Sequence, residues 1–181
     1  MKIEIDDIKF WADAIRNSED RDRVLECFWG GQLRSKSWLV DHVEHHCNVK
    51  NAKIVIYGGW YGVLSTMLFN SNLGIKHITS VDIDPKCKEI ATTMNKRYEM
   101  EGRFTAVTED MCTHTPDKDT YMVINTSCEH ITQEQYNKWL SNIPDDVYIV
   151  LQSNNFKDHD EHINCMQDLG EFKRKSKLKV D

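Results

Sequence analysis

The pattern of hydrophobic and polar positions changes character near residue 50. Before that point, apolar side chains recur at helical spacing, first around 10–15 and again around 39–43. Beyond it, short apolar runs alternate with helical stretches. We expect strands at 54–57, 77–81, 104–107, 121–124 and 147–151, and helices at 63–69, 86–98 and 133–140.

This alternation predicts an α/β fold. Strands joined through helices form right-handed crossovers, and the resulting parallel sheet is covered by helices on both faces. A chain of 181 residues has the size of one domain, so we expect a single domain over 1–181, with a helical cap at 1–50, a core at 51–151 and a short segment at 152–181. The segment 30–36 is expected to be a glycine-hinged connector in the cap, with Ser35 or Ser37 capping the helix after it.

Composition and charge limit the class of protein, the partners and the cellular compartment that we expect. Hydrophobic residues make up 40% and charged residues 29%, as in ordinary globular proteins. No apolar run approaches the roughly 18 residues of a membrane span, and the N-terminus carries acids where a secretory signal is basic, so we expect no membrane association and a cytoplasmic location. The net charge of −6 disfavours nucleic acid as a partner, although the stretch 173–179 is basic. Without CxxC spacing, the six cysteines are expected to be reduced: Cys27, Cys47, Cys87, Cys112, Cys128 and Cys165.

A glycine-rich turn after the first expected strand is the clearest chemical signal. Gly58 and Gly59 follow the strand, and Gly62 precedes the next helix. Glycines here let the backbone approach a ligand where a Cβ would clash, although they also serve to tighten strand–helix packing. Asp82 ends the second strand, where an acid accepts hydrogen bonds from the hydroxyls of an adenosine ribose; the alternative is a plain loop acid. Asp84, followed by a proline, is expected to cap the next helix.

At these residues the chain resembles the class I S-adenosylmethionine-dependent methyltransferases. Segment 57–62 resembles the family's first motif, 81–85 its second, and 123–131 the fourth motif of its small-molecule branch, so the likeness spans roughly 50–151. The resemblance implies a Rossmann-like, doubly wound, mostly parallel sheet of strand order 3-2-1-4-5 and S-adenosyl-L-methionine as the cofactor. The residues it assigns to cofactor binding are Tyr57, Gly58, Gly59, Trp60, Gly62, Asp82, Ile83, Asp110, Met111 and Asn125.

The resemblance also distributes roles among these residues. Asp82 would bind the ribose, while Asp110 would hold the adenine and Met111 would line its ring. Asn125 stands where enzymes that methylate amino groups of DNA begin an Asn-Pro-Pro-aromatic motif. Because 126–128 read Thr-Ser-Cys instead, that substrate class is disfavoured.

Three departures from the family pattern bear on catalytic competence and on the oligomeric state. Ile56 stands where an acid is usual, and Trp60 stands where glycine is frequent. The third departure is the end of the chain, which comes before the family's last two strands. We expect 161–169 to form a short helix and 172–180 at most one strand. The fifth strand, 147–151, is apolar enough to be buried on both faces, and its bare edge then predicts a homodimer; the alternative is a monomer whose C-terminal segment folds back along that edge.

Glu129 and His130 are the candidate catalytic residues. A carboxylate beside an imidazole at the end of a strand is suited to accept a proton from a substrate. Adjacent residues on a helix face different directions, so only one of the two is expected to reach the ligand. The alternative of equal weight is that both residues cap the helix that begins near Thr132.

Weaker patterns suggest contacts with the substrate. Polar side chains follow the fifth strand, at the edge where α/β sheets bind ligands, and others lie in the connector 30–36. Arg34, Ser35 or Lys36 is also suited to pair with the carboxylate at the cofactor's methionine end, the alternative being solvated loop residues. The substrate candidates are Gln32, Arg34, Ser35, Asn154 and Asn155.

Two groups of metal-binding residue types occur, but neither completes a ligand set. We therefore expect no metal site. The groups are His42, His45, His46 and Cys47 in the second cap helix, and His159, His162 and Cys165 near the end of the chain.

The sequence thus favours methyl transfer from S-adenosylmethionine to a small-molecule acceptor, a reaction that depends mainly on orientation and desolvation. One alternative is a non-catalytic binding or assembly protein with the same fold, as the apolar Ile56 suggests. Another is a nicotinamide-dependent oxidoreductase, which fits less well because its fingerprint would place its first glycine at Tyr57.

Overall fold

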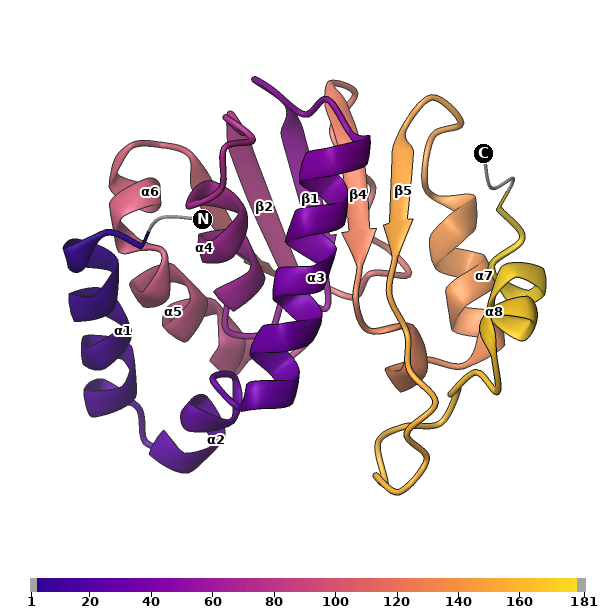
Figure 1. The fold of residues 1–181 in the computed structure, drawn as a ribbon, viewed down its shortest axis with the longest axis horizontal. Helices are drawn as coiled ribbons and strands as arrows, with labels where there is room; N and C mark the ends of the chain where they lie inside the picture. The colour runs from indigo at the N-terminus through magenta and orange to yellow at the C-terminus, as the bar shows by residue number, and fades with distance from the viewer. Residues whose placement is uncertain (1–2, 179–181) are drawn as a thin grey trace.

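The computed structural model describes residues 3–178. Five strands form an all-parallel sheet in the order β3-β2-β1-β4-β5, which confirms the predicted Rossmann-like class and strand order (Figure 1). The strands are β1 (Lys53–Tyr57), β2 (His77–Asp82), β3 (Phe104–Thr108), β4 (Thr120–Asn125) and β5 (Tyr148–Leu151). The helices are α1 (Ile5–Asn17), α2 (Arg21–Glu26), α3 (Gly30–His46), α4 (Val63–Phe69), α5 (Pro85–Met94), α6 (Lys96–Met100), α7 (Gln133–Ser141) and α8 (Leu169–Ser176), with a 3-10 turn, η1, at Cys128–His130.

Alternate side chains of β1 serve the two faces of the sheet, as the period of two requires. Ile54 and Ile56 belong to a large core cluster with residues of α3, α4 and α5. Val55 and Tyr57 belong to a second cluster with residues of α7. In Figure 1, α3 crosses in front of the sheet, whereas α7 and α8 lie together beyond β5. The sheet is therefore covered on both faces, as predicted.

The predicted connector at 30–36 is in fact the first two turns of α3. Neither Ser35 nor Ser37 caps this helix, whose N-cap is Trp29 without a side-chain hydrogen bond. The prediction was wrong because Leu33 packs against the large core cluster and continues the apolar stripe of α3 toward its N-terminus. This tertiary contact outweighs the low helix propensity of the two glycines.

The predicted helix 86–98 is divided at Asn95 into α5 and α6. The buried Asn95 amide donates from Nδ2 to the Gly62 carbonyl (3.0 Å), and its Oδ1 accepts from Thr66 (2.8 Å). These contacts tie the break to the start of α4. The cap prediction at Asp84 is confirmed, since its carboxylate accepts from the Lys86 amide at 2.9 Å.

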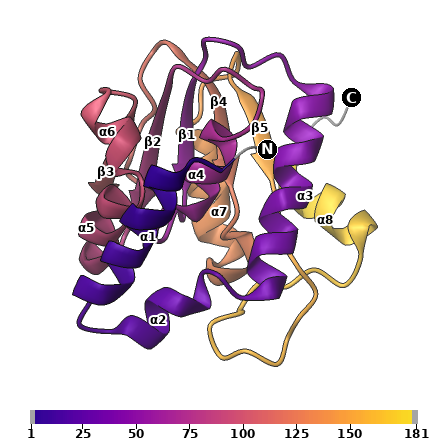
Figure 2. The same ribbon diagram turned by 60° about the vertical axis from the view of Figure 1, so that its left-hand side comes forward.

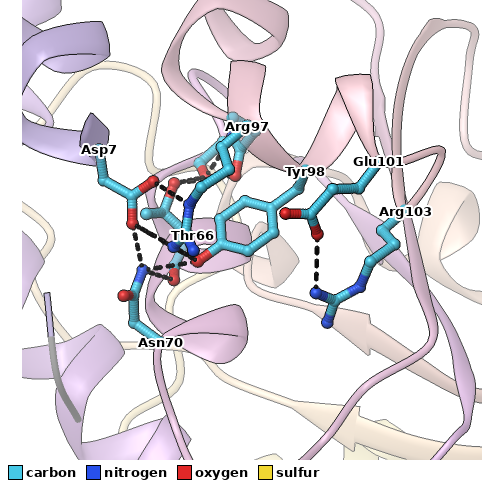
Figure 3. Close-up of polar contacts among 9 residues, drawn as sticks. Asp7, Thr66, Asn70, Arg97, Tyr98, Glu101 and Arg103 are labelled. Carbon is cyan, nitrogen blue, oxygen red and sulfur yellow. Dashed lines mark hydrogen bonds and ion pairs between the residues drawn. The ribbon is translucent and has the colours of Figure 1, made fainter. Parts of the chain in front are cut away.

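A buried carboxylate in the first helix ties α1 to the core (Figure 3). Asp7 is 1% exposed and receives two hydrogen bonds from Arg97 of α6, at 3.0 and 2.8 Å. Its Oδ2 also accepts from Asn70, after α4, at 2.9 Å. The Tyr98 hydroxyl completes the group, donating to Asp7 at 3.4 Å. The planar guanidinium of Arg97 bonds to both carboxylate oxygens, so it neutralises the charge of Asp7 and also fixes its orientation. The pair thereby holds α1 in place against α6.

The segment after β5 differs from the prediction. Residues 161–168 form no helix, and 172–176 belong to α8 rather than to a strand, while 179–180 lie outside the described residues. Asp168 starts α8 by accepting from the Glu171 amide at 2.8 Å, a capping contact that sequence reasoning missed. The helix then docks on α7, where the Tyr136 hydroxyl donates to the Ser176 carbonyl at 2.9 Å.

β5 forms one edge of the sheet and is not buried on both faces. Tyr148 is 58% exposed and the other three residues are partly exposed. The expected burial was wrong because, among the described strands, β5 pairs with β4 alone. Along residues 3–178, no helix is both long and apolar enough to cross a membrane.

The homodimer remains a prediction, now attached to an exposed edge strand that offers unpaired backbone groups. Light scattering at micromolar concentration is expected to give twice the chain mass of 21.2 kDa. A charged substitution at the exposed residue of the edge, Tyr148→Lys, should shift the mass toward that of one chain. A wild-type mass of 21.2 kDa would contradict the dimer.

Candidate functional site

The parallel strands bring their carboxyl ends to one edge of the sheet, the lower edge in Figure 1. Gly58 there has φ +64°, and a Cβ built on it would lie 1.9 Å from Ser127 Oγ. A Cβ on Gly59 would lie 1.9 Å from Ser80 Oγ, and the Gly59 amide donates to the Val81 carbonyl at 3.1 Å. The close neighbours Ser80 of β2 and Ser127, just after β4, therefore favour glycine at both positions even before a ligand is considered.

Trp60 stands where the resemblance noted in the sequence would favour glycine, and its backbone conformation is one that suits glycine better than tryptophan. Its φ is +47°, in the left-handed region that costs a side chain about 1–2 kcal/mol. The conformation aims the Trp60 amide at Asp82, whose Oδ2 accepts from it at 2.8 Å. The ring stacks on Tyr61 with centroids 4.9 Å apart. Glycine would adopt this turn without strain.

Asp82 holds the turn as well as standing at the end of β2. Its second oxygen, Oδ1, accepts from the Asp84 amide at 3.0 Å. Each carboxylate oxygen has a further lone pair, so these two bonds leave capacity for ligand hydroxyls. The neighbouring Ile83 is 70% exposed. An apolar side chain in that position offers a surface for a flat ring.

The segment after β3 lies beside Asp82, because the Glu109 amide donates to the Asp82 carbonyl at 3.0 Å. Asp110 and Met111 are both partly exposed. Asp110 Oδ1 accepts from the Cys112 amide at 2.8 Å, which orients the carboxylate in a tight turn. The structure thus brings the predicted ribose and adenine residues to adjacent strand ends.

Two predicted cofactor residues have side chains that point elsewhere. Tyr57 is fully buried, its hydroxyl bonded to His114 at 2.9 Å and its ring against Trp139, and burial raises its pKa well above the usual value. Asn125 is also fully buried, with Oδ1 accepting from the Ser127 amide at 2.9 Å. Neither residue has accessible surface, and Asn125 instead supports a predicted adenine residue, since its Nδ2 lies 3.6 Å from Met111 Sδ.

Glu129 and His130 lie together in η1, directly after β4. Glu129 Oε1 and His130 Nε2 are 3.9 Å apart, so the two side chains lie close together, and the expectation that only one of them reaches a ligand stays a prediction. The tight 3-10 turn, rather than a helix, sets their directions. Neither caps α7, because Thr132 forms a complete capping box with Gln135.

The Glu129 carboxyl is largely removed from solvent, with its side chain 10% exposed. Burial raises its pKa above the usual range, while backbone hydrogen bonding and the nearby imidazoles oppose that rise. Asn154, one of the predicted substrate residues, donates to Glu129 Oε1 at 2.8 Å. Glu129 Oε2 has no hydrogen-bond partner among the described residues.

The other substrate candidates are more dispersed. Gln32, Arg34 and Ser35 are exposed on the first turns of α3, and Asn155 is exposed after β5. Ser35 touches the sheet edge through its carbonyl, which accepts from Gln152 Nε2 at 3.1 Å. The N-terminal part of α3 therefore lies beside the carboxyl end of β5.

Sequence reasoning missed the association of two residues with Glu129. His162 approaches it from the loop after β5, and only the fold brings 162 near 129. Lys36 faces it electrostatically from α3, and burial lowers the pKa of its ammonium group. The basic character of segment 30–36 had already made Lys36 a candidate for binding a carboxylate. The sequence contains no pattern that would place His162 near the end of β4.

The histidines of α3 were also considered for a metal. His42 and His45 bond through Nδ1 to the carbonyls of Trp38 and Asp41 on their own helix, at 2.8 and 2.6 Å. Among the described residues, the grouping that could hold an ion is Glu129, His130 and His162, and it contains neither.

A shallow groove of about 530 Å³ lies away from this site, between α1 and α5. Its lining contains none of the predicted cofactor or catalytic residues: Phe10, Asp13, Asn17, Pro85, Lys88, Glu89, Thr92, Thr93 and Lys96.

Comparison with solved structures decides the kind of fold. A mutant of MtNAS in complex with S-adenosylmethionine superposes with a TM-score of 0.57 at 13% identity, over 82% of this chain and 56% of that one. A methyltransferase from Thiobacillus denitrificans in complex with S-adenosyl-L-homocysteine gives 0.51 at 12% identity, over 65% and 47%. The small RNA methyltransferase HEN1 gives 0.62 at 15% identity, over 79% and 20%. The chain has the fold of the S-adenosylmethionine-dependent methyltransferases.

This comparison confirms the Rossmann-like methyltransferase fold that the sequence motifs indicated. The chain spans about half the length of the MtNAS and Thiobacillus proteins and a fifth of HEN1. No protein-family model and no curated protein sequence matches it. The likeness therefore lies in the fold, the five-stranded parallel sheet flanked by helices, rather than in the sequence.

Proposed function

We propose that the protein binds S-adenosylmethionine and transfers its methyl group to a small-molecule acceptor. The observation that carries the proposal is the pairing of a strained glycine turn with Asp82, whose carboxylate receives the Trp60 amide at 2.8 Å. This joins the ends of β1 and β2 into one rigid edge. Solved structures of the same fold hold S-adenosylmethionine or S-adenosyl-L-homocysteine, which supports this choice of cofactor.

In this proposal the ends of β1, β2 and β3 receive the adenosine. Asp82 binds the ribose hydroxyls with its remaining lone pairs, Ile83 covers one face of the adenine, and Asp110 with Met111 holds its edge. Gly58 and Gly59 let the backbone approach the amino-acid part of the cofactor. The contact of Ser35 with Gln152 at this end of the sheet supports the further proposal that Arg34, Ser35 or Lys36 pairs with its carboxylate.

Glu129 and His130 would face the acceptor, and burial raises the pKa of Glu129 above that of an exposed carboxyl, as enzymes do for carboxyl groups that exchange protons. The net charge of −6 supports a small molecule over RNA, although RNA methyltransferases share the fold. The full burial of Ile56, in place of the usual acid, favours one alternative, a binding protein without catalysis.

The proposal includes one domain over 1–181 in the cytoplasm. Six free cysteines, four of them buried, support a reducing compartment.

Calorimetric titration with S-adenosylmethionine, S-adenosyl-L-homocysteine and NAD tests the proposal. We expect the first two to bind and NAD to leave the heat unchanged. Binding with no methyl transfer to any acceptor in a small-molecule panel would favour the non-catalytic alternative. NAD binding alone would favour the oxidoreductase.

Asp82→Ala is expected to weaken S-adenosylmethionine binding by about 1–3 kcal/mol, the scale for unpairing hydrogen bonds to a charged group. Asp119→Ala is the matched control, since Asp119 pairs with Lys53 at the opposite end of the sheet, at 2.7 Å. Calorimetry should find its affinity equal to that of the wild type. Equal affinity in a folded Asp82→Ala variant would reject Asp82 as the ribose ligand.

A further inference from the structure

We propose that Glu129, His130 and His162 form a binding site for one divalent transition-metal ion of the Zn²⁺ type. One ligand atom from each residue lies within 4.8 Å of the other two. Two imidazoles and one carboxylate are a ligand set that suits Zn²⁺ and leaves further positions open. The proposal departs from the expectation of no metal, which considered His162 only with its neighbours in sequence.

Both imidazoles are oriented as metal ligands usually are. His130 Nδ1 lies 3.2 Å from the Glu161 carbonyl, and His162 Nδ1 lies 2.7 Å from the Phe156 carbonyl. A carbonyl only accepts, so each Nδ1 carries a proton, and in the neutral imidazole Nε2 is then the nitrogen with the free lone pair. Such bonds to backbone carbonyls fix the tautomer and ring direction of metal-binding histidines.

The carboxylate is held in the same way. Asn154 Nδ2 donates to Glu129 Oε1 at 2.8 Å, while Oε2 is buried without a hydrogen-bond partner among the described residues. A buried carboxylate oxygen without a partner is costly, and an ion would satisfy it. Ligand atoms around tetrahedral zinc stand about 3.4 Å apart, so the three side chains have only to close slightly.

The backbone holds the two parts of the site together. The amides of Ile163 and Asn164 both donate to the Glu129 carbonyl, at 2.9 and 3.0 Å. The Met166 amide donates to the Asn154 carbonyl at 3.1 Å. These bonds fasten the loop after β5 to the turn after β4, so His162 is positioned beside Glu129 before any ion binds.

The role of the ion, though not its binding, rests on the proposed function. The site lies at the carboxyl end of β4, next to the turn that would hold the cofactor. An ion with open positions there would bind an oxygen or nitrogen of the methyl acceptor and hold it at this edge. The acceptor class it favours is therefore a small molecule that can chelate a metal.

The test uses the metal alone on the full chain. After removal of metals with a chelator, we expect one Zn²⁺ per chain by calorimetry, and d–d absorption bands when Co²⁺ replaces it. Millimolar Mg²⁺ should not compete, because Mg²⁺ prefers oxygen ligands. His162→Ala is expected to weaken Zn²⁺ binding about 100-fold or more, since even the loss of an outer-shell partner costs 10–100-fold.

His45→Ala is the matched control, because His45 is exposed on α3, has its Nδ1 against the Asp41 carbonyl and lies outside the group. Its Zn²⁺ affinity should stay within about 2-fold of the wild type. Glu129→Gln, which keeps the side-chain shape, serves as a second variant in case His162→Ala alters the loop. Absence of Zn²⁺ and Co²⁺ binding, or equal affinity in folded His162→Ala and Glu129→Gln, would overturn the site. S-adenosylmethionine titrated in parallel separates failure of the metal site from failure of the proposed function.

Discussion

Asp7→Ala is expected to destabilise the protein by about 3–5 kcal/mol, the scale for removing one partner of a buried ion pair. Asp7 is 1% exposed, so the substitution leaves Arg97 without its bidentate partner and removes one of the three acceptors of the Asn70 amide (Figure 3). The hydrogen bond to Asp7 is also the main reason that the pKa of Arg97 is raised. Urea unfolding followed by circular dichroism measures the loss.

Asp6→Ala is the control, because Asp6 is an exposed acid in the same first turn of α1. It removes the same charge near the helix N-terminus and should cost less than about 1 kcal/mol. The double variant Asp7→Ala/Arg97→Met replaces the pair with apolar groups and should recover part of the loss. If Asp7→Ala were no worse than Asp6→Ala, the network would not fasten α1 to the core.

Gly58→Ala is the second substitution with a large expected effect. The new Cβ would lie 2.5 Å from Ser127 Cβ, so backbone must move, and φ at +64° is itself strained for alanine. Together, left-handed strain of about 1–2 kcal/mol and overpacking of about 1–3 kcal/mol predict a loss of about 2–5 kcal/mol in unfolding free energy. Displacing the turn should also weaken S-adenosylmethionine binding at least 10-fold.

Two comparisons isolate the cause of that loss. Gly102→Ala has the same kind of backbone, φ +69°, but its Cβ would meet open space, so it should lose only the conformational part and leave cofactor affinity unchanged. In Gly58→Ala/Ser127→Gly the nearest remaining Ser127 atom position is Cα, at 3.8 Å, an ordinary contact. Much of the stability should return. Equal losses of unfolding free energy in Gly58→Ala and Gly102→Ala would show that the steric contact between Gly58 and Ser127 does not affect stability.

The sequence determined the features that follow from local rules. Alternation along β1 separates Ile54 and Ile56 from Val55 and Tyr57, and the structure assigns these pairs to opposite faces. Asp84 and the proline after it identified the start of α5 from two adjacent residues. The strand order 3-2-1-4-5 came from the resemblance to a family, because pairing order is not written in any one segment.

The tertiary structure decided whatever depends on contacts between distant segments. Leu33 extends α3 through two glycines because it packs on the core, and Asn95 divides α5 from α6 because it bonds to Gly62 and Thr66. Propensity is a few tenths of a kcal/mol per residue, which such contacts readily exceed. His162 approaches Glu129 for the same reason: backbone hydrogen bonds fold one loop onto another, and no spacing rule in the sequence encodes that approach.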